Sequence, residues 1–112
     1  MGLDFHGSEA HWSYGGFDRF RTKLAAAIGM DFDEFCEGKP VSEANVKDPV
    51  FPLLNHSDCD GDMLPEICAQ VAPRLRELVA PWPDGNYDKK KALLLAEGMD
   101  ECAKRGERLL FC

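Results

Sequence analysis

The sequence predicts an α+β fold in which about four helices pack on a small sheet formed by the two chain termini. In several segments between the two ends of the sequence, apolar residues recur every three or four positions, which places them on one face of a helix. Residues 3–5 alternate apolar and polar side chains, and residues 109–111 form a short apolar run near the other end. Two short strands are not stable alone, so we expect them to lie side by side against the helices.

Length and composition indicate a single globular domain over residues 1–112. The chain is 45% hydrophobic and 29% charged, which is typical of folded rather than disordered proteins. Its net charge of -7 repels phosphate backbones, so we expect no nucleic-acid partner. The sequence shows neither a membrane span nor a secretory signal, and we expect a cytoplasmic protein without a membrane partner.

The five cysteines do not form the even, dense pattern of a disulfide scaffold. Their odd number and wide spacing favour reduced thiols in the cytoplasm. Cys68 and Cys102 fall on the apolar stripes of two predicted helices, and we expect both thiols to be buried.

Two helices are predicted in the first half of the chain. The first begins after Ser13, whose hydroxyl is a common cap, and ends at Gly29. A short one follows over residues 32–37 with Asp31 as its cap. Residues 39–56 show no periodicity, and no helix or strand is predicted there.

Two longer helices are predicted in the second half. The third starts at Pro65, and Pro73 is expected to kink it or to split it at Ala72. The fourth is expected to be capped by Asp88 and to end at Gly106. Lys89, Lys90 and Lys91 in its first turn oppose the helix dipole. We expect them to be solvated; the alternatives are that they face the acidic segment, residues 55–66, or bind an anion.

The acidic segment, residues 55–66, holds aspartates at alternate positions, then a glycine and a helix start. Hard cations bind several oxygen ligands around such a turn, and residues 56–67 resemble a degenerate EF-hand calcium loop. The simpler alternative is that Asp60 or Asp62 caps the helix that follows.

Four residues of this segment are candidate metal ligands: His56, Asp58, Asp60 and Asp62. The resemblance carries over directly only to Asp58 and Asp60, and Asp62 is expected to contribute its backbone carbonyl. Histidine replaces the usual first carboxylate, and Ile67 stands where a bidentate glutamate is usual. Nitrogen, oxygen and sulfur donors in the same segment would also suit a transition metal if His6 or His11 approached them. Cys59 could act as a nucleophile beside His56, but its negatively charged neighbours oppose a reactive thiolate.

Aromatic and polar side chains in predicted loops form a candidate binding surface, because large amphipathic rings often anchor partners. The residues concerned are His11, Trp12, Tyr14, Asn55, Cys59, Trp82 and Tyr87. The alternative is that the aromatic rings cover the small core.

The chain also resembles small uncharacterised bacterial and phage proteins that open with Gly-Leu-Asp-Phe and carry an Asn-His-Ser-Asp-Cys-Asp-Gly segment. The resemblance implies no activity. With no catalytic motif in the sequence, we expect a small acidic binding or interaction protein, such as an inhibitor, an immunity-type protein or a ligand-sequestering domain. Its partner would be another protein or a small ligand. The alternatives are a module that binds a divalent cation and a small metal-assisted or cysteine hydrolase.

Overall fold

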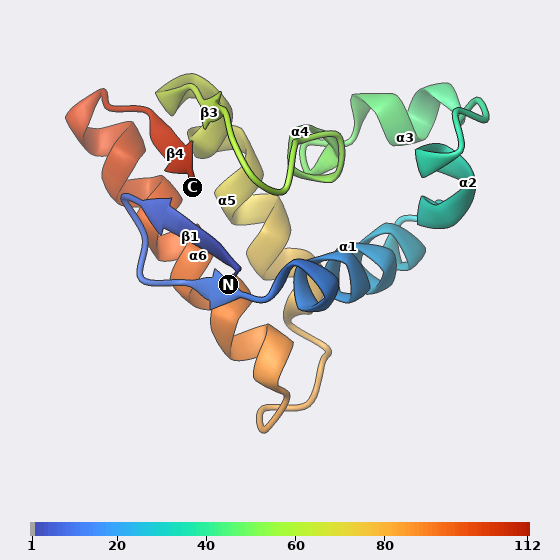
Figure 1. Cartoon of the computed structure of the whole chain (residues 1–112), viewed down its shortest axis with the longest axis horizontal. Coiled ribbons are helices and arrows are strands. Elements are labelled where there is room, and N and C mark those ends of the chain that lie inside the picture. The colour runs from blue at the N-terminus through green and yellow to red at the C-terminus, as the bar shows by residue number, and fades with distance from the viewer. Residues whose placement is uncertain (1) are drawn as a thin grey trace.

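The computed structural model describes residues 2–112, which fold into six helices and a small sheet at one side of the molecule (Figure 1). The helices are α1 (Tyr14–Ala27), α2 (Phe32–Cys36), α3 (Glu43–Lys47), α4 (Phe51–Leu54), α5 (Pro65–Val79) and α6 (Tyr87–Arg105). The strands are β1 (Leu3–His6), β2 (His11–Trp12), β3 (Asp62–Met63) and β4 (Leu109–Phe111). The prediction of a mixed fold is confirmed, but the predicted number of four helices is wrong.

The sheet joins the two ends of the chain. Its order is β2-β1-β4-β3, and all neighbouring strands are antiparallel. In the central pair, Phe5 lies opposite Phe111. The prediction that residues 3–5 pair with residues 109–111 is therefore confirmed. Two edge strands of two residues each, β2 and β3, were not predicted because so short a run has no readable period.

One face of the sheet is buried against the helices and the other is exposed. Alternation along β1 and β4 places Leu3, Phe5, Leu109 and Phe111 inside. Trp12 of β2 also points inward, where its ring stacks on Phe20 of α1 at 4.8 Å between centroids. Side chains from both ends of the chain thus share one core with α1, α5 and α6.

Helix ends follow local capping chemistry. Ser13 and Asp31 cap α1 and α2 through hydrogen bonds from backbone amides, as predicted. The cap of α6 is Asn86, so the prediction of Asp88 is wrong. Asp88 lies inside the first turn, where its carboxylate accepts from Trp12 instead. Gly106 ends α6 in the left-handed conformation, as predicted.

The segment 39–56 holds α3 and α4, which periodicity could not reveal because each is little more than one turn. Asp48 stands between them and binds Val50 N and the Arg74 guanidinium of α5. Burial alone would raise the pKa of Asp48, but the hydrogen bonds from Arg74 and Val50 outweigh it and hold that pKa below its usual value. The ion pair between Asp48 and Arg74 thus holds residues 39–56 in place, although this segment has no periodic apolar face.

Helix α5 runs unbroken through Pro73, so the predicted split is wrong. Pro73 has no amide hydrogen to donate to the Ala69 carbonyl, and both residues are exposed, so this loss falls on the solvent side of the helix. No helix formed by residues 2–112 is long and apolar enough to cross a membrane.

Candidate functional site

Arg21 of α1 anchors the start of the acidic segment. Its guanidinium is buried and donates to the carbonyl oxygens of Leu54 and His56, at 3.4 and 2.6 Å. It also donates to Asp18 at 3.1 Å and lies over the Phe17 ring, 4.5 Å from its centroid. The positive charge therefore holds backbone carbonyls at the end of α4 rather than an external anion.

After His56, the acidic segment forms a turn held by hydrogen bonds to Ser57 and Gly61. The Ser57 hydroxyl accepts from the amides of Cys59 and Asp60, at 3.2 and 3.4 Å. Gly61 adopts φ 93°, where a side chain would be strained, and its carbonyl accepts from Phe111 of β4. The acidic segment is an ordered turn that enters β3 and the sheet.

His56 closes this turn. Its ring stacks on Phe111 at 3.6 Å between centroids. Nδ1 lies 2.9 Å from the Ser57 carbonyl oxygen, and Nε2 lies 2.8 Å from the Asp62 carbonyl oxygen. Both ring nitrogens face main-chain oxygens, so this arrangement leaves neither of them directed at a metal or at the Cys59 thiol.

The candidate metal ligands do not meet. Within residues 2–112 no group of three or more histidine, cysteine, aspartate or glutamate side chains is placed to hold a metal ion. The Asp62 carbonyl, expected to face a cation, faces His56, and the Asp62 carboxylate accepts from Arg108 at 2.8 Å. His11 pairs with Asp4 at 2.6 Å on the exposed face of the sheet.

The alternative that Asp60 or Asp62 caps the next helix is wrong. The residue at the cap position of α5 is Leu64, and no side chain caps it. Pro65 begins the helix and has no amide hydrogen that would need a partner.

The predicted binding surface is divided by the fold. Trp12, expected in a loop, lies in β2 with 1% of its surface exposed, and Trp82 packs edge-on against Phe20. Tyr14 and Tyr87 are exposed, at 37% and 72%. The remaining candidates, His11, Asn55 and Cys59, are exposed at three separate positions on the chain.

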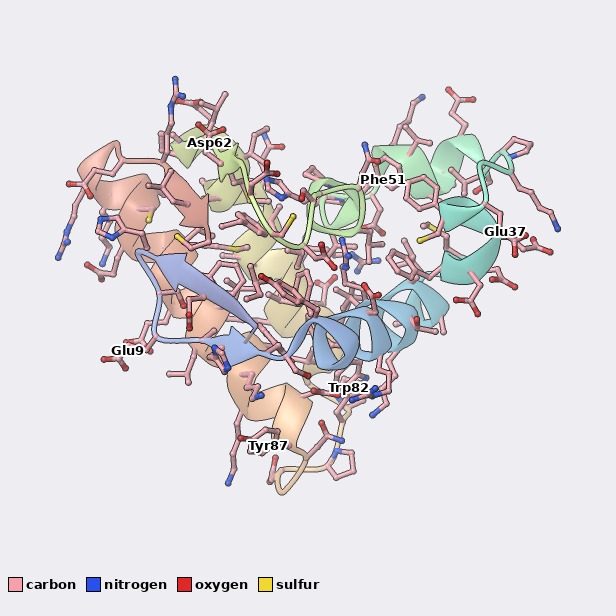
Figure 2. All side chains as sticks on the ribbon, viewed as in Figure 1. Glu9, Glu37, Phe51, Asp62, Trp82 and Tyr87 are labelled. Atoms are coloured by element: carbon pink, nitrogen blue, oxygen red, sulfur yellow. The ribbon has the colours of Figure 1, made fainter. Side chains whose placement is uncertain are left out.

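A different region emerges where the chain from Ser8 to Trp12 runs alongside α6. The Ser8 hydroxyl donates to the Leu94 carbonyl at 3.0 Å, and the Trp12 indole donates to Asp88 at 3.2 Å. Gly98 permits this approach, because a Cβ there would lie 2.4 Å from Ser8 Cβ. In Figure 2, Glu9 is at the left of the view and Tyr87 at the bottom, whereas Asp62 of the acidic segment is at the top.

The first hollow along this contact is acidic. It has a volume of about 420 Å³ and lies between the turn after β1 and the C-terminal half of α6. Its lining residues are Gly7, Ser8, Glu9, Leu94, Glu97, Gly98, Glu101 and Arg105. Within residues 2–112, Glu9 and Glu97 form no ion pair, whereas Glu101 pairs with Arg105 at 3.8 Å. We call this the acidic hollow.

The second hollow is basic and lies at the start of α6. It has a volume of about 310 Å³ and is lined by Trp12, Ser13, Gly16, Arg19, Tyr87, Asp88 and Lys91. The Lys91 ammonium lies 4.1 Å from the centroid of the Tyr87 ring. We call this the basic hollow.

The three consecutive lysines therefore have different surroundings. Lys89 donates to the carbonyls of Ala80 and Trp82 and to the Asp84 carboxylate, so it satisfies the end of α5. Its hydrogen bond and charge hold the pKa of Asp84 below the usual value. Lys91 lines the basic hollow instead, and neither ammonium contacts the acidic segment.

Trp12 and Tyr87 of the basic hollow were candidate binding residues, and anion binding by the lysines was one alternative, but neither hollow was predicted as a site. The buried apolar face of α6 could be predicted from the sequence, but a second face of that helix lies against the chain from Ser8 to Trp12. It consists of Tyr87, Lys91, Leu94, Gly98, Glu101 and Arg105. A glycine inside an otherwise helical pattern, Gly98, is the one signal that a backbone packs there.

No family model, no curated protein and no solved structure matches this chain.

Proposed function

We propose that this protein is a binding module that holds a cationic side chain of a protein partner in the acidic hollow. The observation that carries the proposal is the pair of carboxylates, Glu9 and Glu97, that line one concave site without an ion-pair partner among the described residues. Other carboxylates, such as Asp58 and Asp60, also form no ion pair among the described residues, but they do not line this hollow; Glu9 and Glu97 share one concave site that an external cation can enter.

The hollow has the features of a recognition site for an arginine or lysine. Leu94 is 37% exposed and offers an apolar surface to the methylene groups of such a side chain. The net charge of -7 attracts a basic surface and repels acidic ones. Carboxylates can accept charge-assisted hydrogen bonds from a guanidinium.

The walls of the hollow are held in place before a partner arrives. The turn at Gly7 rests on α6, because Ser8 bonds Leu94 and Gly98 leaves room for the backbone. A site built from rigid elements loses little conformational entropy on binding. This arrangement favours a binding role over catalysis, for which the described residues offer no paired nucleophile and base.

Selection from a random peptide library displayed on phage tests the proposal. Peptides enriched on the wild-type protein are expected to carry arginine or lysine. They should bind the Glu9→Gln/Glu97→Gln variant roughly tenfold more weakly, since charge-assisted hydrogen bonds are lost. Asp58→Asn/Asp60→Asn is the matched control, because it changes the net charge by the same amount at another surface.

Binding that is weakened only by the Glu9/Glu97 change supports the proposal. Enriched peptides without a cationic residue, equal binding to both double variants, or no enrichment at all would overturn it. Circular dichroism of each variant establishes that the fold is retained.

A further inference from the structure

We propose that the basic hollow binds the free C-terminal carboxylate of the same partner peptide, so that the protein recognises a peptide end with a basic residue a few positions before it. The inference rests on the proposed function. It follows from the charges of the two hollows, their spacing along α6 and the position of α1.

Two cations in the basic hollow lack a carboxylate partner. Within residues 2–112, every lysine and arginine forms an ion pair except Arg19, Lys90 and Lys91. Two of these three line the same hollow. In an acidic protein, a concave site with two available cations is suited to an anionic group.

Asp88 also lines this hollow, but its carboxylate is already engaged. It accepts from the Trp12 indole at 3.2 Å and pairs with Lys23 at 3.6 Å. The Lys91 ammonium lies between the rings of Tyr87 and Trp12, at 4.1 and 5.6 Å from their centroids. These contacts hold one cation in place at the site.

The two hollows lie at a spacing that one short peptide can span. Lys91, Leu94 and Glu101 share one stripe of α6. The rise from Lys91 to Glu97 and Glu101 is about 9 to 15 Å, at about 1.5 Å per residue. An extended peptide covers about 3.3 Å per residue, so roughly three to five residues separate its two charged groups.

A chain end fits the basic hollow better than an internal acidic side chain. The first turn of α1, from Ser13 to Gly16, forms one wall of the hollow. Further along α1, Lys23 reaches Asp88 of α6. A peptide that follows α6 toward its N-terminus therefore meets α1, and its backbone ends there. A terminal carboxylate also presents two oxygens to the planar guanidinium of Arg19.

Isothermal titration with synthetic peptides tests this inference. The probe is acetyl-Arg-Ala-Leu-Ala with a free carboxylate, compared with the same peptide as a C-terminal amide, and with longer forms that contain more alanines. The free acid is expected to bind roughly tenfold more tightly than the amide. Lys91→Gln, which leaves Arg19 as the one unpaired cation of the hollow among the described residues, should reduce the ratio of acid to amide affinity severalfold. Lys90→Gln, an adjacent lysine outside the hollow, is the matched control.

The outcomes separate this inference from the proposed function. If acid and amide bind equally and Glu9→Gln/Glu97→Gln weakens both, the terminal-carboxylate site is overturned and the acidic hollow stands. An amide peptide ending in aspartate that matches the free acid would also overturn it, because a side chain would then suffice. If neither form binds the wild-type protein, both the inference and the proposed function fail.

Discussion

The acidic segment and the acidic hollow are both rich in carboxylates, yet the chain uses their polar groups differently. In the acidic segment, His56, Ser57 and Gly61 bind the main chain, and Asp62 binds Arg108. In the acidic hollow, Glu9 and Glu97 lie in a concave site without such partners among the described residues. Candidate ligands that are adjacent in the sequence thus need not converge: His56 and Asp62 are engaged within the chain, and within residues 2–112 Asp58 and Asp60 form no ion pair but do not join a third ligand. Charges from distant segments instead share one concave site.

The largest expected contrast is between the exposed thiol of the acidic segment, Cys59, and the buried core thiol of α5, Cys68. Burial raises the pKa of Cys68 to about 11, with a further contribution from Cys102, whose own pKa is also raised by burial. Cys59 in the acidic segment is exposed. At pH 8 we expect a thiol reagent to modify Cys59 at least a hundredfold faster than Cys68, since the thiolate reacts. Peptide mapping after timed labelling measures this, and equal rates would show that the core opens readily.

Gly98→Ala is expected to disturb the acidic hollow. The added Cβ would lie 2.6 Å from the Gly7 carbonyl oxygen, so the turn after β1 must move. We expect a loss of about 1 to 3 kcal/mol in the free energy of unfolding, as for other overpacked sites. Urea denaturation measures it. Gly85→Ala is the matched control, since that position has open space. Equal stability of the two variants would contradict the close approach.

Arg21→Met tests the anchor of the acidic segment. It leaves the carbonyls of Leu54 and His56 without their donor, and we expect a loss of about 2 kcal/mol in unfolding free energy. Arg19→Met, on the exposed side of α1, should change stability by less than about 0.5 kcal/mol. Thermal and urea unfolding of both variants would decide this. A similar loss in both would mean that Arg21 is not the specific anchor.

The smallest effect is expected from calcium. Because no three ligand side chains of residues 2–112 converge and both His56 nitrogens face main-chain oxygens, millimolar calcium should not raise the melting temperature measured by differential scanning fluorimetry. Asp60→Ala should change stability by less than about 0.5 kcal/mol with or without calcium. A calcium-dependent rise that Asp60→Ala abolishes would restore the cation site and break the comparison between the two regions.

Elements with strong local signals could be predicted from the sequence. The apolar stripe of α1 and the caps at Ser13 and Asp31 are local features, and so is Gly106. The pairing of β1 with β4 could be predicted because each short strand needs a partner. By contrast, α4 depends on Arg21 and on the pair between Asp48 and Arg74, which lie far apart in the sequence. Such tertiary contacts leave no periodic trace.

The two hollows could not be predicted from the sequence as sites. The sequence drew attention to residues 55–66, where ligand types are adjacent in the chain. Both hollows instead combine Glu9 or Trp12 with residues of α6 about eighty positions later. Only the fold of the chain brings them together, although Gly98 indicated a close backbone approach and Trp12 and Tyr87 were candidate binding residues.

Nitrogen-15 NMR titration with a peptide selected on the wild-type protein tests the central claim most directly. The account predicts that shift changes concentrate at residues 7–9 and 94–101, on the two walls of the acidic hollow. Residues 55–61 should stay unchanged through the titration. Shift changes concentrated in residues 55–61, with residues 7–9 and 94–101 unaffected, would contradict the account and make the acidic segment the binding site.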